Sequence, residues 1–270
     1  MENEGLIEVN GLRLFYREWS CTGDSPRDHL LMLHGNSGTC ASWEPIAAQL
    51  AKNFNLLAID LRGHGYSSWS PDADYSARSM ADDVAKVLNG FGFESYSLLG
   101  HSMGGRVAMA FAEKAPAGLR RLIVEDIRPQ PHSLMGLPRP ERFSSLAEAV
   151  EMFLQHNPGA IAEAEAWAKR LMRTEDRDWT WQFDRTMRDP NIDRRHMGAE
   201  EAWNAFLNII VPTLLVRGAT SDLLKANEAE EMVAAGKDCR LITIENAGHR
   251  VHGDQPEAFL QAIIPFLMEK

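Results

Sequence analysis

Cysteine, long apolar runs and a targeting segment are all scarce or missing in this sequence. Cys21, Cys40 and Cys239 are the only three cysteines, and no Cys-x-x-Cys pair occurs. An odd count without that spacing indicates neither a disulfide framework nor a cysteine-rich metal site. No apolar run reaches the ~18 residues that a membrane span needs. Residues 1–4 lack the basic start and apolar stretch of a secretory signal, so we expect a cytoplasmic protein without membrane contact.

Positive charge is also in short supply. The chain of 270 residues carries 28 Lys and Arg against 38 Asp and Glu, which gives a formal net charge of −10. That balance disfavours nucleic acid as a partner, because phosphate binding needs clustered basic residues. Gly63-His64-Gly65 lacks the lysine and the spacing of a phosphate-binding loop. We therefore expect a small-molecule substrate, no cofactor and no metal, while the oligomeric state stays open.

Short apolar runs alternate with helical patterns along the chain. Such runs are typical of strands buried on both faces of a parallel sheet. They predict strands at Leu30–Leu33, Leu56–Ile59, Leu98–Leu99, Leu122–Val124 and Thr213–Val216, after an N-terminal hairpin of Leu6–Val9 and Leu12–Trp19. Apolar residues at three-to-four spacing predict helices at Trp43–Lys52, Ser79–Asn89, Gly104–Lys114, Ala226–Ala235 and Pro256–Met268. This alternation predicts an α/β sheet with right-handed crossovers.

One long stretch interrupts the alternation. Between Ile127 and Ile210 we find mainly helical patterns and no convincing strand. Roughly 80 residues are too many for a plain connection, and such insertions are usually functional. We therefore predict a core of residues 1–127 and 211–270 and an inserted helical cap, or lid, of residues 128–210. The cap is rich in large apolar side chains, namely Trp167, Trp179, Trp181, Trp203, Met135, Met152, Met172, Met187 and Met197.

The segment from Leu98 to Gly105 is the most informative part of the chain. An apolar strand runs into Gly100-His101-Ser102-Met103-Gly104, and a helical pattern follows. This Gly-x-Ser-x-Gly arrangement is typical of a nucleophile elbow, in which a strained turn exposes the serine hydroxyl. The glycines let neighbouring backbone approach closely, and the helix turns its positive end towards a developing oxyanion. We predict Ser102 as the nucleophile.

Four motifs together resemble the α/β-hydrolase superfamily. They are His34-Gly35-Asn36, Asp60-Leu61-Arg62-Gly63-His64-Gly65-Tyr66-Ser67, the segment around Ser102, and Asn246-Ala247-Gly248-His249. They occur in the family's order and span almost the whole chain. The resemblance implies an α/β-hydrolase fold, with a mostly parallel central sheet flanked by helices and an inserted cap.

The resemblance also implies where an oxyanion would bind. One donor is the backbone amide of Met103, which follows the nucleophile. The second implied donor is the amide of Asn36, after the His-Gly pair. We expect His34 to brace this loop rather than to act in catalysis. Haloalkane dehalogenases can carry an asparagine at the same place, but their nucleophile is an aspartate, and Ser102 argues against that reaction.

The base follows from the same motifs, whereas the acid has two candidates. His249 lies in a loop after the strand-like Arg240–Ile244, where it can reach the serine as general base. The family's usual position for the acid is occupied by Ser221, with Asp222 one residue later. Asp126 ends the predicted strand beside the nucleophile strand and resembles the Asp-Ile-x-Pro signature of relatives whose acid lies there. We favour Asp126 and keep Asp222 as the alternative.

The predicted chemistry is hydrolysis of a carboxylic ester or a lactone. Trp and Met side chains in the cap suit a large apolar ligand, or else pack the cap helices together. The acidic side chains there could meet a cationic group or face solvent; they are Glu141, Glu163, Glu165 and Asp184. The chain is similar to bacterial esterases that open bulky lactones, including macrolide esterases that confer antibiotic resistance. A carbon–carbon bond hydrolase and a hormone-type receptor of the same fold are the alternatives.

Overall fold

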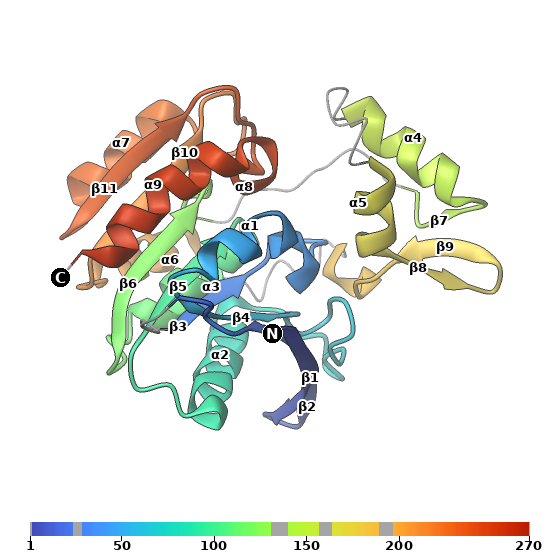
Figure 1. The fold of residues 1–270 in the computed structure, drawn as a ribbon, viewed down its shortest axis with the longest axis horizontal. Helices are drawn as coiled ribbons and strands as arrows, with labels where there is room; N and C mark the ends of the chain where they lie inside the picture. Colours follow the sequence, from blue (N-terminus) through green and yellow to red (C-terminus); the bar gives the residue numbers. More distant parts are fainter. Residues whose placement is uncertain (1, 24–28, 131–139, 157–163, 189–196, 270) are drawn as a thin grey trace.

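An eight-stranded sheet runs through the larger lobe of the molecule (Figure 1). The structure is a computed structural model that describes residues 2–23, 29–130, 140–156, 164–188 and 197–269. The spatial order of the strands is β1-β2-β4-β3-β5-β6-β10-β11. Their bounds are β1 (Glu2–Val9), β2 (Leu12–Trp19), β3 (His29–Leu33), β4 (Asn55–Ile59), β5 (Tyr96–His101), β6 (Leu119–Glu125), β10 (Thr213–Gly218) and β11 (Cys239–Ile244). Strand β2 is antiparallel to both its neighbours, and the pairs from β4 to β11 are parallel.

Helices cover both faces of this sheet. One face is covered by α2 (Ala77–Phe91), α3 (Met103–Ala112), α6 (Ala199–Leu207) and α7 (Ala226–Ala235). The other face is covered by α1 (Glu44–Leu50), α8 (Val251–Asp254) and α9 (Pro256–Met268), with the short turn η1 (Cys40–Trp43). Among the described residues, no helix has the length and apolar character to cross a membrane. The predicted mostly parallel sheet flanked by helices is confirmed.

The apolar runs predicted as buried strands supply the core. In β3, Leu31 and Leu33 pack into the apolar cluster on the α2–α3 face. Leu30 and Met32 pack into the cluster on the α1–α9 face. All four side chains are fully buried, which is why the run shows no polar alternation.

The N-terminal hairpin is also confirmed, and it is longer than predicted. Its turn residues Asn10 and Gly11 have φ of 49° and 76°, the left-handed values that a tight hairpin turn requires. Strand β1 begins at Glu2 rather than at Leu6, because it pairs with β2 along its whole length. The extra residues are polar and lie at the sheet edge, so no apolar pattern marks them.

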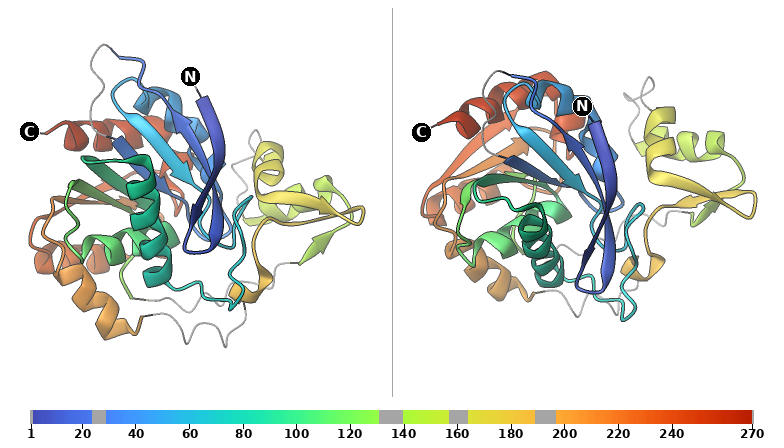
Figure 2. Two further views of the ribbon diagram at one scale, coloured as in Figure 1. Left: turned by 90° about the horizontal axis from the view of Figure 1, so that it is seen from below. Right: turned by 60° about the horizontal axis from the view of Figure 1, so that its bottom comes forward.

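Part of the predicted insertion forms a second, smaller lobe beside the core (Figures 1 and 2). We call the described residues 142–156 and 164–188 the cap lobe. It contains α4 (Leu146–His156), α5 (Ala164–Leu171), the turn η2 (Arg185–Arg188) and three short strands, β7 (Arg142–Phe143), β8 (Met172–Glu175) and β9 (Asp178–Trp181). The strands form an antiparallel sheet in the order β7-β9-β8, so the prediction of no strand in this stretch was wrong.

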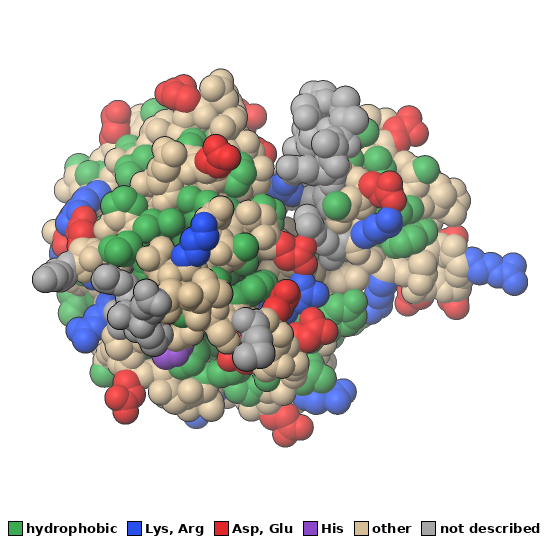
Figure 3. All heavy atoms as spheres, viewed as in Figure 1, with side chains coloured by type: hydrophobic (Ala, Val, Ile, Leu, Met, Phe, Trp, Pro, Cys, Tyr) green, Lys and Arg blue, Asp and Glu red, His purple; other side chains and the backbone are tan. Residues whose placement is uncertain are grey.

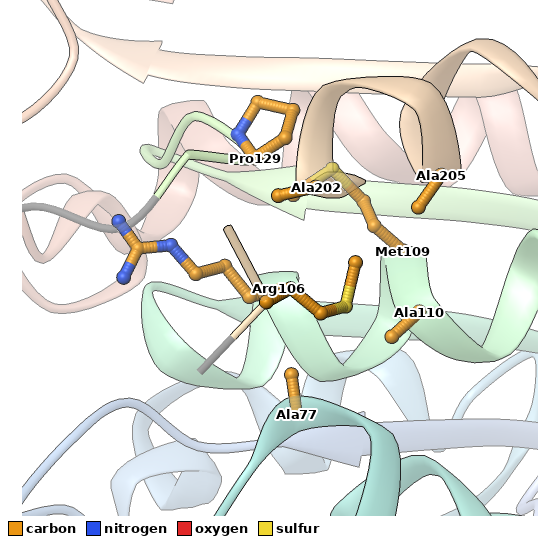
Figure 4. Close-up of a pocket in the computed structure, with 8 residues that line it drawn as sticks. Ala77, Arg106, Met109, Ala110, Pro129, Ala202 and Ala205 are labelled. Atoms are coloured by element: carbon orange, nitrogen blue, oxygen red, sulfur yellow. The ribbon is translucent and has the colours of Figure 1, made fainter. Parts of the chain in front are cut away.

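Helix α6 follows the cap lobe in the chain but packs on the core. It contacts α3, and its Phe206 belongs to the apolar cluster on the α2–α3 face. A cavity of about 40 Å³ lies between α2, α3 and α6 (Figure 4). Apart from Arg106, its lining side chains are small or apolar, including Ala77, Met109 and Ala202. Of the predicted cap residues, Met135, Glu163 and the Trp167 side chain lie outside the described residues.

Candidate active site

Ser102 stands at a sharp turn between β5 and α3. Its backbone has φ 52° and ψ −118°, a left-handed φ that costs a non-glycine residue free energy. The Ser102 amide donates to the carbonyl oxygen of Glu125 at 3.0 Å, which ties the turn to the neighbouring strand β6. The strained turn therefore leaves the hydroxyl at the carboxyl end of the parallel strands, where sites of α/β sheets gather.

Close backbone contacts explain the two glycines that flank the serine. A Cβ atom on Gly100 would lie 2.3 Å from the carbonyl oxygen of Gly104. A Cβ atom on Gly104 would lie 2.2 Å from the carbonyl oxygen of Leu33 in β3. Any side chain at either position would force the strand and helix apart, so the motif is a packing requirement of the turn.

His249 connects the serine to a carboxylate. It lies in the loop between β11 and α8, and its Nε2 is 2.8 Å from Ser102 Oγ. Its Nδ1 is 2.8 Å from Asp126 Oδ2. With the proton on Nδ1 and donated to Asp126, Nε2 keeps the lone pair that accepts the serine proton. The structure thus brings together all three residues of the predicted triad.

Asp126 follows β6 directly and is fully buried. The amide of Gly218 donates to its Oδ1 at 2.9 Å, and the Ser221 hydroxyl donates to its Oδ2. With His249, three donors therefore hold the buried carboxylate in one orientation. Asp222, the alternative acid, is exposed to solvent. Ser221, at the family's usual acid position, thus supports the carboxylate that faces His249.

The loop after β3 packs against the serine. A Cβ atom on Gly35 would lie 2.6 Å from His101 Nδ1 and 3.1 Å from Ser102 Cβ, so the close approach favours a glycine. The next residue is Asn36, one predicted oxyanion donor, and Met103, the other, begins α3. Among the residues that the structure describes, no acceptor bonds to the backbone amide of Asn36 or Met103. Asn36 and Met103 therefore remain the predicted donors to an oxyanion.

His34 braces this loop, as expected. Its Nδ1 donates to the carbonyl oxygen of Gly35 at 2.8 Å, and its Nε2 accepts from the amide of Leu61 at 2.9 Å. Burial lowers the pKa of His34 well below its usual value, and the neighbouring His64 adds to this effect. The ring is therefore neutral, with both nitrogens used for structure.

Among the described residues, hydrogen bonds connect the cap lobe to the loop that follows β4. The Gly65 amide donates to the carbonyl oxygen of Gln182 at 2.6 Å, and the Asp184 amide donates to that of Gly63 at 2.7 Å. The Tyr75 hydroxyl donates to the buried Asp184 carboxylate. These bonds join the loop after β4 to the end of the cap sheet.

The large side chains of the cap lobe pack mainly against one another. Trp181 is 2% exposed and belongs to a small apolar core with Phe143 and Phe183, while Trp179 packs partly buried against it. The Nε1 of Trp181 donates to the carbonyl oxygen of Pro140 at 2.9 Å. Met152, Met172 and Met187 also contact this small core.

The acidic cap side chains for which both a cationic group and solvent were open have partners within the chain, where the structure describes them. Glu141 Oε2 lies 3.3 Å from Arg185, and Glu165 Oε1 lies 2.6 Å from Lys169. Asp184 accepts from Tyr75, as described above. On the face shown in Figure 3, acidic and basic side chains are interspersed over both lobes. These contacts favour a structural role for the acidic groups of the cap.

Two features near the triad have no motif in the sequence. Gly218 ends β10, and a Cβ atom there would lie 2.0 Å from the carbonyl oxygen of Gly248, beside His249. His101 and His252 are both buried, and His101 Nε2 donates to the carbonyl oxygen of His249 at 2.9 Å. Gly218 lies directly before the loop that contains Ser221 and Asp222, and this position is the local signal that could have indicated its close packing against the His249 loop.

Comparison with known proteins identifies the family. A family model described as the alpha/beta hydrolase family matches residues 30–262. The 3-hydroxybutyrate-oligomer hydrolase of Cupriavidus necator is 29% identical over 259 residues, covering 88% of this chain and 87% of the relative. The N-formylmaleamate deformylase of Pseudomonas putida is 27% identical over 270 residues, covering 97% and 96%. The solved structure of E-2-(acetamidomethylene)succinate hydrolase covers 100% of both chains with a TM-score of 0.86 at 22% identity, a likeness of fold. The chain belongs to the alpha/beta hydrolase family.

Proposed function

We propose that this chain hydrolyses a carboxylic ester or a lactone through an acyl-enzyme intermediate on Ser102. The observation that carries the proposal is the continuous hydrogen-bond chain from Ser102 through His249 to buried Asp126, with 2.8 Å at each joint. A serine hydroxyl is a weak nucleophile until an oriented base removes its proton. This arrangement supplies the base, its orientation and its correct tautomer.

The proposed reaction has two halves. Ser102 Oγ attacks the carbonyl carbon while His249 Nε2 takes its proton, and the backbone amides of Asn36 and Met103 donate to the resulting oxyanion. When the intermediate collapses, the leaving alcohol takes the proton from His249. A water molecule then attacks the acyl-enzyme while His249 takes its proton; the bond to Ser102 Oγ breaks, Ser102 takes the proton back from His249, and the acid is released. Asp126 stays ionised and stabilises the imidazolium in both halves.

The substrate class rests on the reaction geometry and on relatives. One relative is named as a hydrolase of 3-hydroxybutyrate oligomers, which supports an oxygen ester. We propose that the substrate binds between the cap lobe and the core, since the cap lobe joins the core at the loop after β4. Within the insertion 128–210, residues 142–188 would form the lid, whereas α6 returns to the core. A bulky lactone, such as a macrolide ring, is the largest member of the proposed class.

Multiple turnover of an aryl ester tests the proposal. Ser102→Ala should lower kcat on the order of 10⁶-fold, since the triad members act as a unit. The matched control is Ser144→Ala, which removes the hydroxyl of an exposed serine in the cap lobe. A serine-directed phosphonate should label Ser102. Fewer than one turnover per molecule would instead favour a receptor, and cleavage of a vinylogous diketone without ester cleavage would favour a carbon–carbon bond hydrolase.

The substrate itself is sought with a panel. Simple aryl esters, aliphatic esters, small lactones and a macrolide lactone are incubated with the wild-type chain and with Ser102→Ala, and products are read by mass spectrometry for the gain of one water. A product that forms equally with both proteins does not come from the Ser102 site.

A further inference from the structure

A second carboxylate–histidine pair is buried directly behind the proposed triad. Glu125 is the last residue of β6, and its side chain is fully buried. It accepts from the backbone amide of His252 at 2.9 Å and from His252 Nδ1 at 2.8 Å. His252 is itself 2% exposed, and its ring lies 4.5 Å from that of Trp43. The pair therefore connects the end of β6 to the short helix α8.

Glu125 carries a charge in this buried site. Burial opposes ionisation, but attraction to His252 and His101 and the hydrogen bonds from His252 outweigh it and lower the pKa of the carboxyl to about 2. At neutral pH Glu125 is therefore an ionised carboxylate, hydrogen-bonded to His252 and next to Asp126 in the chain. A buried charge is costly to keep, and breaking its hydrogen bonds destabilises a protein strongly.

The Glu125–His252 pair lies next to the segment that carries His249, the proposed base. Glu125 and Asp126 are consecutive, and they hold His252 and His249, which are three residues apart. His101, the residue before Ser102, donates from Nε2 to the carbonyl oxygen of His249. The ring of His101 lies 4.7 Å from that of His249 and 5.2 Å from that of His252. The segment 249–252 is thus held at three places. The His249 side chain bonds to Asp126, the His249 carbonyl oxygen accepts from His101, and His252 at the start of α8 bonds to Glu125.

Few other titratable groups lie near His249 and Glu125. Among the described residues, the titratable groups facing His249 and Glu125 are Asp126 from the end of β6, His101 from β5 and His252 from α8. The η1 turn and α9 present the uncharged rings of Trp43 and Phe259 to His252. In the described part of the chain, His252 is the basic side chain bonded to Glu125, and it forms an ion pair with that carboxylate when it is protonated.

We propose that Glu125 and His252 are positioning residues for the proposed reaction, a clamp that fixes His249 against Ser102 and adds the field of a second buried carboxylate to the base. The inference rests on the proposed function, because it assigns His249 the role of base. Glu125 touches no reacting atom and acts through the 249–252 segment. Its hydrogen bonds to His252 keep the His249 imidazole in place between attack and proton transfer.

Glu125→Gln tests the charge, because glutamine keeps the shape and one acceptor oxygen. We expect kcat on an aryl ester to fall about tenfold with KM unchanged. The acid limb of the pH profile of kcat/KM should move to lower pH, because the variant lacks the negative charge beside the segment 249–252. The matched control is Glu257→Gln, the same substitution at an exposed position in the first turn of α9, which should leave the profile unchanged.

Two substitutions of His252 test the clamp independently of that charge. His252→Asn keeps an N–H donor near the position of Nδ1, and kcat should stay within about threefold of wild type. His252→Ala loses the donor, and kcat should fall at least tenfold with KM unchanged. This pair decides the matter if Glu125→Gln does not fold. Equal kcat for the two His252 variants, or a wild-type kcat and pH profile for Glu125→Gln, would overturn the inference. Loss of activity in Ser102→Ala would still support the proposed function in that case.

Discussion

At the scale of single residues, the identity of the triad acid gives the most specific prediction. Asp126→Asn keeps the shape of the side chain but favours the wrong tautomer of His249, and a comparable change in another serine hydrolase cost about 10⁴ in kcat. Asp222 is exposed, so Asp222→Asn should cost less than tenfold. The measurement is kcat/KM of both variants on one aryl ester. The reverse order of effects would show that Asp222 orients the base.

The sequence reveals these residues to very different degrees. Ser102 lies in a motif whose geometry is local, so the motif with the apolar strand before it and the helical pattern after it predicts the turn. The acid depends on which strand end faces His249, and 123 positions separate Asp126 from that histidine. A family resemblance could favour Asp126 over Asp222, but the three donors that hold its carboxylate come from separate segments. Glu125 and His252 are 127 positions apart and belong to no motif, so only the fold shows their contact.

At the scale of elements, the turn between β5 and α3 depends on close packing against β3. Gly104→Ala would place a Cβ atom 2.2 Å from the carbonyl oxygen of Leu33 and 2.6 Å from that of His34. Backbone atoms cannot move aside cheaply, so we expect the free energy of unfolding to fall by about 3 kcal/mol. Urea denaturation measures it.

Gly198→Ala is the matched control for this substitution. Gly198 precedes α6, has φ −58°, and has open space where its Cβ would lie. Its free energy of unfolding should change by less than about 1 kcal/mol. Equal losses in the two alanine variants would contradict the role given to the contact with β3.

Elements differ in how much of their structure the sequence reveals. The central strands are predictable because burial on both faces requires uninterrupted apolar runs such as Leu30–Leu33. The cap strands contain two to four residues each, too few for an alternating pattern. The turn between β8 and β9 gives Asp176 and Arg177 φ of 52° and 79°, without the glycine that usually indicates such a hairpin. Contacts with Phe143 and Trp181 within the cap lobe stabilise what local preference does not predict.

At the scale of the whole molecule, buried neutral histidines make stability depend on pH. Burial lowers the pKa of His64 to about 4 and that of His101 to about 3, and it lowers the pKa of His34 as well. The unfolded chain therefore binds more protons than the folded chain below about pH 6.5. We expect the free energy of unfolding to be greatest above that pH and to fall as the pH drops towards 4.

Thermal unfolding followed by circular dichroism from pH 8 to pH 4 checks this expectation. Burial raises the pKa of Asp60, which opposes the trend, but one carboxyl should not offset three histidines. A Tm that stays constant between pH 7 and pH 4.5 would contradict the prediction. Activity is measured separately, because the acid limb of the rate also contains the titration of the catalytic base.

The contact between the loop after β4 and the cap lobe should affect the access of large substrates more than it affects the rate of the chemical step. Tyr75→Phe removes the hydroxyl that donates to Asp184, a side chain only 6% exposed, so the cap lobe loses one of its bonds to the core. A hydrogen bond to a charged group contributes about 1.5–3 kcal/mol, enough to loosen the lobe without unfolding the core. We expect KM for a bulky ester to rise about tenfold while kcat for a small aryl ester changes less than twofold. Tyr66→Phe is the control, because Tyr66 lies in the same loop and is 68% exposed. Equal losses on both esters would mean that Tyr75 supports the core as a whole rather than the position of the cap lobe.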